Sequence, residues 1–189
     1  MIATRRVLML TALAGCSRSP EPSLFTLAAL PGQAHPGGPA TVELRRPGLA
    51  GYLDRPEIVR AAGPYRVGVS GTERWAEPFG DMLGRVLAEN LTYRMPGSAI
   101  FTEAGGLSAS GDAVVELDVQ RFDADASGMV TLLAQLAVRH NGSRRPAPSP
   151  LTVRLMVPAA SAATPDTVMA MSQALGQLAD TMAGLLRGR

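Results

Sequence analysis

The spacing of apolar positions predicts an amphipathic helix in the middle of this chain of 189 residues. The helix is expected to begin at residues 77–78, where a proline at an early position loses no needed hydrogen bond, and to end at residues 95–97. Charged residues at i, i+4 spacing (Asp81, Arg85 and Glu89) are expected to form a ladder on its polar side. Its apolar face recurs every three or four positions and consists of Phe79, Met82, Leu83, Val86, Leu87 and Leu91.

A second helix is predicted to begin at residues 164–166, with Thr164 as the N-cap, proline at the first position and an acid in the first turn. Its stripe follows 3-4-3-4-3 spacing and consists of Val168, Met171, Leu175, Leu178, Met182 and Leu185. Small residues beside the stripe allow a close approach to another surface: Ala170, Ala174, Ala179 and Ala183. Such a stripe fits a partner helix or a helix lying on a sheet, and we favour the sheet.

Alternation of apolar and polar positions predicts strands before and between these helices. They are expected near residues 24–28, 41–45, 57–60, 65–69, 98–101, 113–122, 129–139 and 151–157. Residues 140–143, with Asn-Gly at the centre, are typical of a type I′ hairpin turn that exposes His140. Two amphipathic helices cannot bury themselves, so they must pack on the sheet. The pattern predicts an α/β fold, a single-domain sandwich in which a mixed, largely antiparallel sheet carries two amphipathic helices.

The N-terminus has the features of a secretory signal. Arg5 and Arg6 precede an apolar run of about eight residues, which is far short of the ~20 needed to span a membrane. Residues 13–16 read Leu-Ala-Gly-Cys and resemble a bacterial lipobox, in which signal peptidase II cuts before the cysteine and the thiol carries a diacylglycerol. The alternative is an ordinary signal peptide with an incidental cysteine. We predict a lipoprotein signal peptide over residues 1–15 and lipidation of Cys16, and we favour general secretion over the twin-arginine route.

Two or more acyl chains anchor a protein stably on a membrane, whereas one binds only marginally. A triacylated Cys16 would therefore hold the chain on a bilayer, and Ser17, where an aspartate would suggest inner-membrane retention, favours the outer membrane. Residues 16–39 contain five prolines and three glycines, which predicts a lipidated N-terminus and a tether with a short strand near 24–28. His35 in this segment is expected to be solvated. Residues 40–189 are expected to form the folded domain.

Removal of the signal peptide changes the charge. All eighteen basic residues are arginines and two leave with the signal, so 18 − 2 = 16 remain against 16 acids. A formal net charge of zero gives no reason to expect a nucleic-acid partner. The mature chain has 189 − 15 = 174 residues. A domain of ~150 residues buries about 70% of its unfolded surface, so it can be stable without disulfides.

The sequence contains no Gly-x-Ser-x-Gly motif, no phosphate-binding loop and no histidine-rich metal spacing. We therefore expect no enzymatic activity, no cofactor and no metal site. Asp118, Asp123 and Asp125 alternate with apolar residues and are expected on a solvated face. A carboxylate pair for glycoside hydrolysis has no local signature, so the pattern leaves that alternative open.

Two stretches, residues 51–59 and 72–79, combine aromatic residues with arginines, as protein interfaces often do. They supply the candidate interface residues Tyr52, Asp54, Arg55 and Trp75. The other interpretation is turn chemistry around a buried tryptophan, with arginines paired to acids. We divide the set: Trp75, just before the helix, is expected to lie mainly in the core, and Arg55 is expected to be exposed and to act in docking or self-assembly.

Several of these segments, taken together and in order, resemble the ABC-type transport auxiliary lipoproteins, the PqiC family. The resemblance covers nearly the whole mature chain. It rests on the lipobox and on the segments LFTLAALPG (24–32), YLDRPEIV (52–59), RWAEPF (74–79), VLAENL (86–91), ELDVQRFDAD (116–125) and AMSQALGQLADTMA (170–183). Each motif alone has low specificity, and their order along one chain provides the specificity.

This resemblance implies a lipoprotein on the periplasmic face of the outer membrane. Its partners would be MCE-domain tunnel proteins and inner-membrane transporter components that move lipid between the two membranes. The chain would be a docking or exit component that maintains envelope integrity, with a homo-oligomeric ring around the tunnel's end as one mode of assembly. The alternative is an outer-membrane lipoprotein that scaffolds envelope assembly or activates a cell-wall enzyme.

Substitution Cys16→Ala is expected to abolish acylation, because only the thiol can form the thioether to diacylglycerol. The substituted chain should remain as an uncleaved or soluble precursor. Metabolic labelling with a fatty-acid analogue, followed by membrane fractionation, measures this. Equal label in the substituted and unsubstituted chains would refute lipidation at Cys16.

Overall fold

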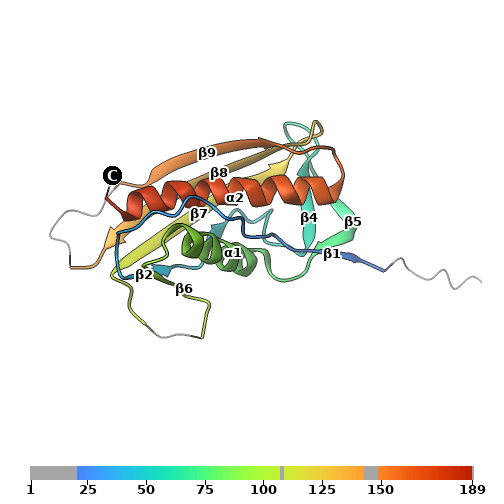
Figure 1. The fold of residues 1–189 in the computed structure, drawn as a ribbon. Coiled ribbons are helices and arrows are strands. Elements are labelled where there is room, and N and C mark those ends of the chain that lie inside the picture. Colours follow the sequence, from blue (N-terminus) through green and yellow to red (C-terminus); the bar gives the residue numbers. More distant parts are fainter. Residues whose placement is uncertain (1–20, 107–108, 143–148, 189) are drawn as a thin grey trace, which may run out of the picture.

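A computed structural model describes residues 21–106, 109–142 and 149–188. Cys16 and the predicted signal peptide lie outside the described residues. Figure 1 shows two helices side by side on one face of an unclosed sheet, with the N-terminal part of the chain crossing over the helices. This arrangement confirms the predicted single α/β domain with helices packed on a mixed, largely antiparallel sheet.

The longest strands form an antiparallel meander. β7 (Ala113–Ala124) pairs with β8 (Met129–His140) along its whole length, from Ala113 opposite His140 to Ala124 opposite Val130. β9 (Leu151–Pro158) pairs antiparallel with the other side of β8. Alternate residues of these strands face the helices, because side chains on a strand point to opposite faces in turn.

Short strands occupy the other side of β7. Three of them pair with it in succession, all parallel: β2 (Thr41–Leu44), β3 (Gly48–Leu49) and β4 (Glu57–Ala61). β6 (Ala99–Thr102) pairs parallel with β2, β5 (Val67–Trp75) pairs antiparallel with β4, and β1 (Ser23–Phe25) pairs parallel with β5. The predicted strand at 24–28 is thus shorter and the one at 65–69 longer than expected.

Helix α1 (Phe79–Arg94) buries every residue of the predicted apolar face, and its polar side differs from the prediction. Asp81 pairs with Arg46 at 3.0 Å, and Arg85 pairs with Glu77 at 2.5 Å. The expected ladder within the helix is therefore wrong, because the flanking loops bring closer partners of opposite charge. Pro78 occupies the N-cap position and makes no side-chain cap.

Helix α2 (Thr164–Leu186) lies against β7, β8 and β9, and its stripe is buried except for half-buried Leu185. The stripe is therefore buried within this chain, where α2 packs on the sheet, as favoured, and also against α1. Thr164 is not the N-cap: Ala163 holds that position, and no side chain caps the helix. The Thr164 hydroxyl accepts a hydrogen bond from Arg60 Nη2 at 2.8 Å. The oxygen that would accept a backbone N–H in an N-cap is thus bonded to an arginine of β4.

The predicted type I′ turn at 140–143 is wrong. Among the described residues only glycines have positive φ, so Asn141 cannot take the left-handed conformation that this turn requires. The Asn141 amide N–H and side chain instead donate to the carbonyls of Asp112 and Gly111, beside the start of β7. β9 begins at Leu151, opposite Leu136, so the connection is longer than a tight hairpin. His140 is exposed, as expected.

Candidate functional site

The described surface has a hollow between two turns of the sheet. A shallow hollow of about 360 Å³ lies between the β4–β5 turn and the β7–β8 turn, and its one acid is Asp125. The Ser127 hydroxyl donates to Asp125 at 2.6 Å and lowers the pKa of that carboxyl, so it is an ionised acceptor held in a turn. Within the described ranges no group of three or more His, Cys, Asp or Glu residues could hold a metal ion.

The described helices include none that is long and apolar enough to cross a membrane.

Tyr52 covers a buried acid on the sheet face opposite the helices. Its hydroxyl donates to Asp123 Oδ2 at 2.8 Å, and Arg121 Nη2 pairs with the other carboxylate oxygen at 2.9 Å. Burial, with the hydrogen bond to Asp123, raises the pKa of Tyr52, so the phenol remains a donor. The expectation that Asp123 is solvated is wrong: it points to the outer face of the sheet, yet with Tyr52 and Arg121 against it Asp123 is only 4% exposed.

Asp54 and Arg55 lie on an exposed turn between β3 and β4. Leu53, which is 2% exposed, fixes this turn to the core. The Arg55 amide donates to the Leu53 carbonyl at 2.9 Å, which closes the turn and directs the next side chains outward. Arg55 Nε lies 3.6 Å from Glu57 Oε2, a loose pair that leaves the guanidinium accessible.

Trp75 lies beneath that turn and is 6% exposed. Its ring stacks on Phe79 with centroids 4.9 Å apart, and Phe79 in turn contacts Phe122 on β7. The Trp75 amide donates to the Pro56 carbonyl at 2.8 Å. Burial places Trp75 in the core, as its position before the helix predicted, so it supports the exposed turn from below.

A strap, residues 26–35, crosses both helices between β1 and β2 (Figure 1). Its amides bond to helix side chains: Leu27 N–H to Met82 Sδ at 3.3 Å, Ala28 N–H to Ser172 Oγ at 3.1 Å and Leu30 N–H to Asn90 Oδ1 at 3.1 Å. Residues 26–35, which we expected to belong to a tether, are therefore bonded to both helices. His35 is half-buried, and its amide donates to the Arg94 carbonyl at 2.7 Å.

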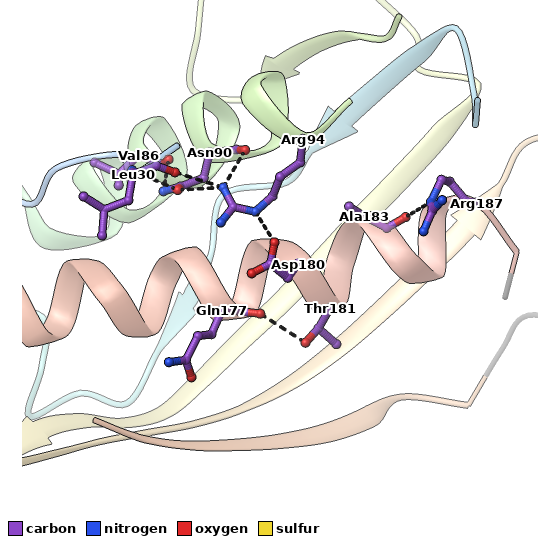
Figure 2. Close-up of polar contacts among 9 residues, drawn as sticks. All are labelled: Leu30, Val86, Asn90, Arg94, Gln177, Asp180, Thr181, Ala183 and Arg187. Carbon is purple, nitrogen blue, oxygen red and sulfur yellow. Dashed lines mark hydrogen bonds and ion pairs between the residues drawn. The ribbon is translucent and has the colours of Figure 1, made fainter. Parts of the chain in front are cut away.

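The guanidinium of Arg94, 3% exposed, joins the strap to both helices (Figure 2). Nη1 donates to the Leu30 carbonyl at 3.0 Å and to the Asn90 carbonyl at 3.1 Å, while Nε pairs with Asp180 at 2.5 Å on α2. A Cβ atom on Gly32 would lie 2.3 Å from the guanidinium carbon. Glycine is needed there because the strap backbone covers the cation directly.

Sequence reasoning missed this cluster. The signal was present in α1, because Asn90 and Arg94 continue the three- and four-residue spacing of the apolar stripe beyond Val86 and Leu87. A polar residue on a buried stripe needs partners from other elements.

Comparison with known proteins gives a consistent result. The family model for the ABC-type transport auxiliary lipoprotein component matches residues 25–183. An uncharacterized protein of known crystal structure is 16% identical with a TM-score of 0.73, and the match covers 88% of this chain and 99% of that one. Protein XCC0632 from Xanthomonas campestris, of the DUF330 family, is 21% identical with a TM-score of 0.70, over 87% and 94% of the two chains. No curated protein is significantly similar in sequence.

Substitution Trp75→Ala is expected to lower the free energy of unfolding by about 3–5 kcal/mol, because it leaves a cavity beside Phe79. Arg55→Ala should leave it within about 0.5 kcal/mol, since the side chain is exposed and its ion pair is loose. Thermal and denaturant melts of both variants measure the difference. A large loss for Arg55→Ala, with little for Trp75→Ala, would reverse their assignment to surface and core.

Substitution Arg94→Lys keeps the charge but cannot supply the guanidinium's divergent donors to Leu30, Asn90 and Asp180. We expect the free energy of unfolding to fall by about 1.5–3 kcal/mol. Arg46→Lys is the control, because Arg46 pairs with Asp81 on the exposed side of the same helix and should change stability by less than about 0.5 kcal/mol. Equal denaturation midpoints for the two variants would show that the buried cluster contributes no more than a surface pair.

Proposed function

Because the chain belongs to the family of ABC-type transport auxiliary lipoprotein components, we propose that it is a non-enzymatic subunit of an MCE-type intermembrane lipid transport system. It sits on the periplasmic face of the outer membrane and serves as a docking or exit component for the tunnel. The observation that carries the proposal is the family match over residues 25–183. The lipobox-like residues 13–16 agree with it, and Ser17 supports the outer membrane over the inner.

The absence of an enzymatic role is part of this proposal. A lipoprotein that assists a transporter has to hold partners, and the described chain offers exposed surfaces on a rigid scaffold for that task. Asp125, the acid in the shallow hollow, is already satisfied by Ser127 and by the amide of Met129. The buried acid Asp123 is satisfied by Tyr52 and Arg121. Neither carboxylate is free for general acid–base work.

The exposed turn with Asp54 and Arg55 is the docking site that we propose for the MCE-domain protein. Leu53 and the Pro56 carbonyl hold the turn on the core, so little conformational entropy is lost when it binds. Arg55 presents a planar cation suited to an acidic or carbonyl-rich surface. Tyr52 lies behind the turn and orients it through Asp123.

Capture of the MCE-domain protein encoded beside this chain tests the proposal. Arg55→Ala should weaken capture by about 30-fold, which is the ~2 kcal/mol expected of an interface hot spot. Arg139→Ala is the matched control: Arg139 is 47% exposed and lies 3.4 Å from Glu116, close to the 43% and 3.6 Å of Arg55, and it lies on the far strand β8.

Equal weakening by Arg55→Ala and Arg139→Ala would contradict docking through this turn. No capture by the unsubstituted, acylated chain would contradict the transport role itself. Neighbouring reading frames provide a second check: an MCE-domain gene supports transport, and cell-wall synthesis genes favour the scaffold or enzyme-activator alternative.

A further inference from the structure

Exposed apolar side chains gather on the sheet face that points away from the helices, along its β1–β5 side. Trp75 faces the core, so its neighbour Arg74 and the strand partner Leu24 point to the opposite face. In β4, Ile58 faces the core, so Val59 and its partner Val69 also point away. Leu24 is 64% exposed and Val69 50% exposed.

The turn at the start of β5 extends this surface. Tyr65 is fully exposed and Val67 nearly half exposed, and Arg66 between them is exposed as well. We call Leu24, Tyr65, Arg66, Val67, Val69 and Arg74 the β1–β5 patch. Apolar side chains interleaved with tyrosine and arginine match the membrane–water interface, where the rings and aliphatic groups enter the acyl boundary and the cations meet phosphates.

The chain itself says which surface lies close to this patch. β1 begins at Ser23, seven residues after Cys16. Seven residues span at most about 25 Å even when fully extended. Acyl chains on Cys16 would therefore hold the start of β1, and with it the β1–β5 side of the domain, within about 25 Å of the bilayer. Figure 1 shows β1 and β5 side by side at the end where the described chain begins.

The domain is also held in orientation relative to that attachment. β1 pairs with β5 over Ser23 to Phe25, and the strap that follows is fixed to α1 by Asn90 and to α2 by Ser172. The residues from β1 onward therefore keep one orientation relative to the domain. The short segment between Cys16 and β1 joins the domain beside an apolar, cationic patch. This position favours contact between the patch and the membrane that holds Cys16.

We propose that the β1–β5 patch lies in the headgroup layer of the bilayer that holds Cys16, so that the domain rests on the membrane in one orientation. This inference rests on the acylation of Cys16 in the proposed function. It goes beyond that function by assigning the lipid-contacting surface, and it directs the helices and the strap away from the bilayer.

Site-specific fluorescence on the acylated full chain tests the inference. Cys16 is the only cysteine, so once it is acylated an introduced cysteine is the single free thiol. Leu24→Cys and Val69→Cys report on the patch. Met156→Cys is the matched control, 56% exposed on the same sheet face but on edge strand β9, and Met169→Cys, 62% exposed, reports on α2.

Each variant carries an environment-sensitive dye and is reconstituted into vesicles of phosphatidylethanolamine and phosphatidylglycerol that contain doxyl-labelled phosphatidylcholine. Dyes at positions 24 and 69 should shift to the blue and be quenched at least about threefold more than dyes at 156 and 169, since interfacial side chains enter about 5–10 Å into the boundary. Unchanged melting curves confirm that the labelled chains are folded.

Equal quenching at all four positions, or none at 24 and 69, overturns the inference. A blue shift at 24 and 69 without quenching also overturns it, because a second copy or another protein would then cover the patch. The mass of the purified chain separates this failure from that of the proposed function: an unacylated chain overturns both, whereas an acylated chain without the quenching contrast overturns the membrane contact alone.

Discussion

The burial of one cation, the Arg94 guanidinium, constrains the arrangement of the whole helix layer. A buried charge is costly unless it is paired and hydrogen-bonded. Arg94 meets that requirement with partners from three separate segments: Asn90 on its own helix, Asp180 on α2 and the Leu30 carbonyl on the strap. None of these segments can move without leaving the guanidinium short of a partner.

The hydrogen bond from the Arg94 guanidinium to the Leu30 carbonyl fixes where the strap crosses the helices. It leaves β1 at one side of the sheet, crosses both helices and returns to the sheet as β2 beside β7. Gly32 permits the close crossing, because any side chain there would meet the guanidinium. The helices are therefore held between the sheet and the N-terminal part of the chain.

Periodicity correctly predicted the features that are local to one helix or one strand. The stripes of α1 and α2 and the long alternation of β7 and β8 are local patterns, and burial of one face follows directly from them. These patterns were enough to predict the two-layer arrangement, and Trp75 was correctly expected in the core because it precedes an apolar helix face.

Features that depend on a distant partner could not be predicted in this way. Thr164 stands in a sequence that is typical of an N-cap, yet its hydroxyl accepts a hydrogen bond from Arg60 on β4. Asp123 alternates like a solvated residue on the outer face of the sheet, yet Tyr52 and Arg121 bind it there and it is buried. The strap has the composition of a loop, and only the partners on two helices turn it into packed structure.

Native-state hydrogen exchange tests the central claim, that the strap and the helices form one cooperative unit around Arg94. The strap amides of Leu27, Ala28, Leu30 and His35 should open with the same free energy as an amide in the core of α1, such as that of Leu87. Exchange of the strap amides at the rate of an exposed loop, while the Leu87 amide stays protected, would contradict the claim.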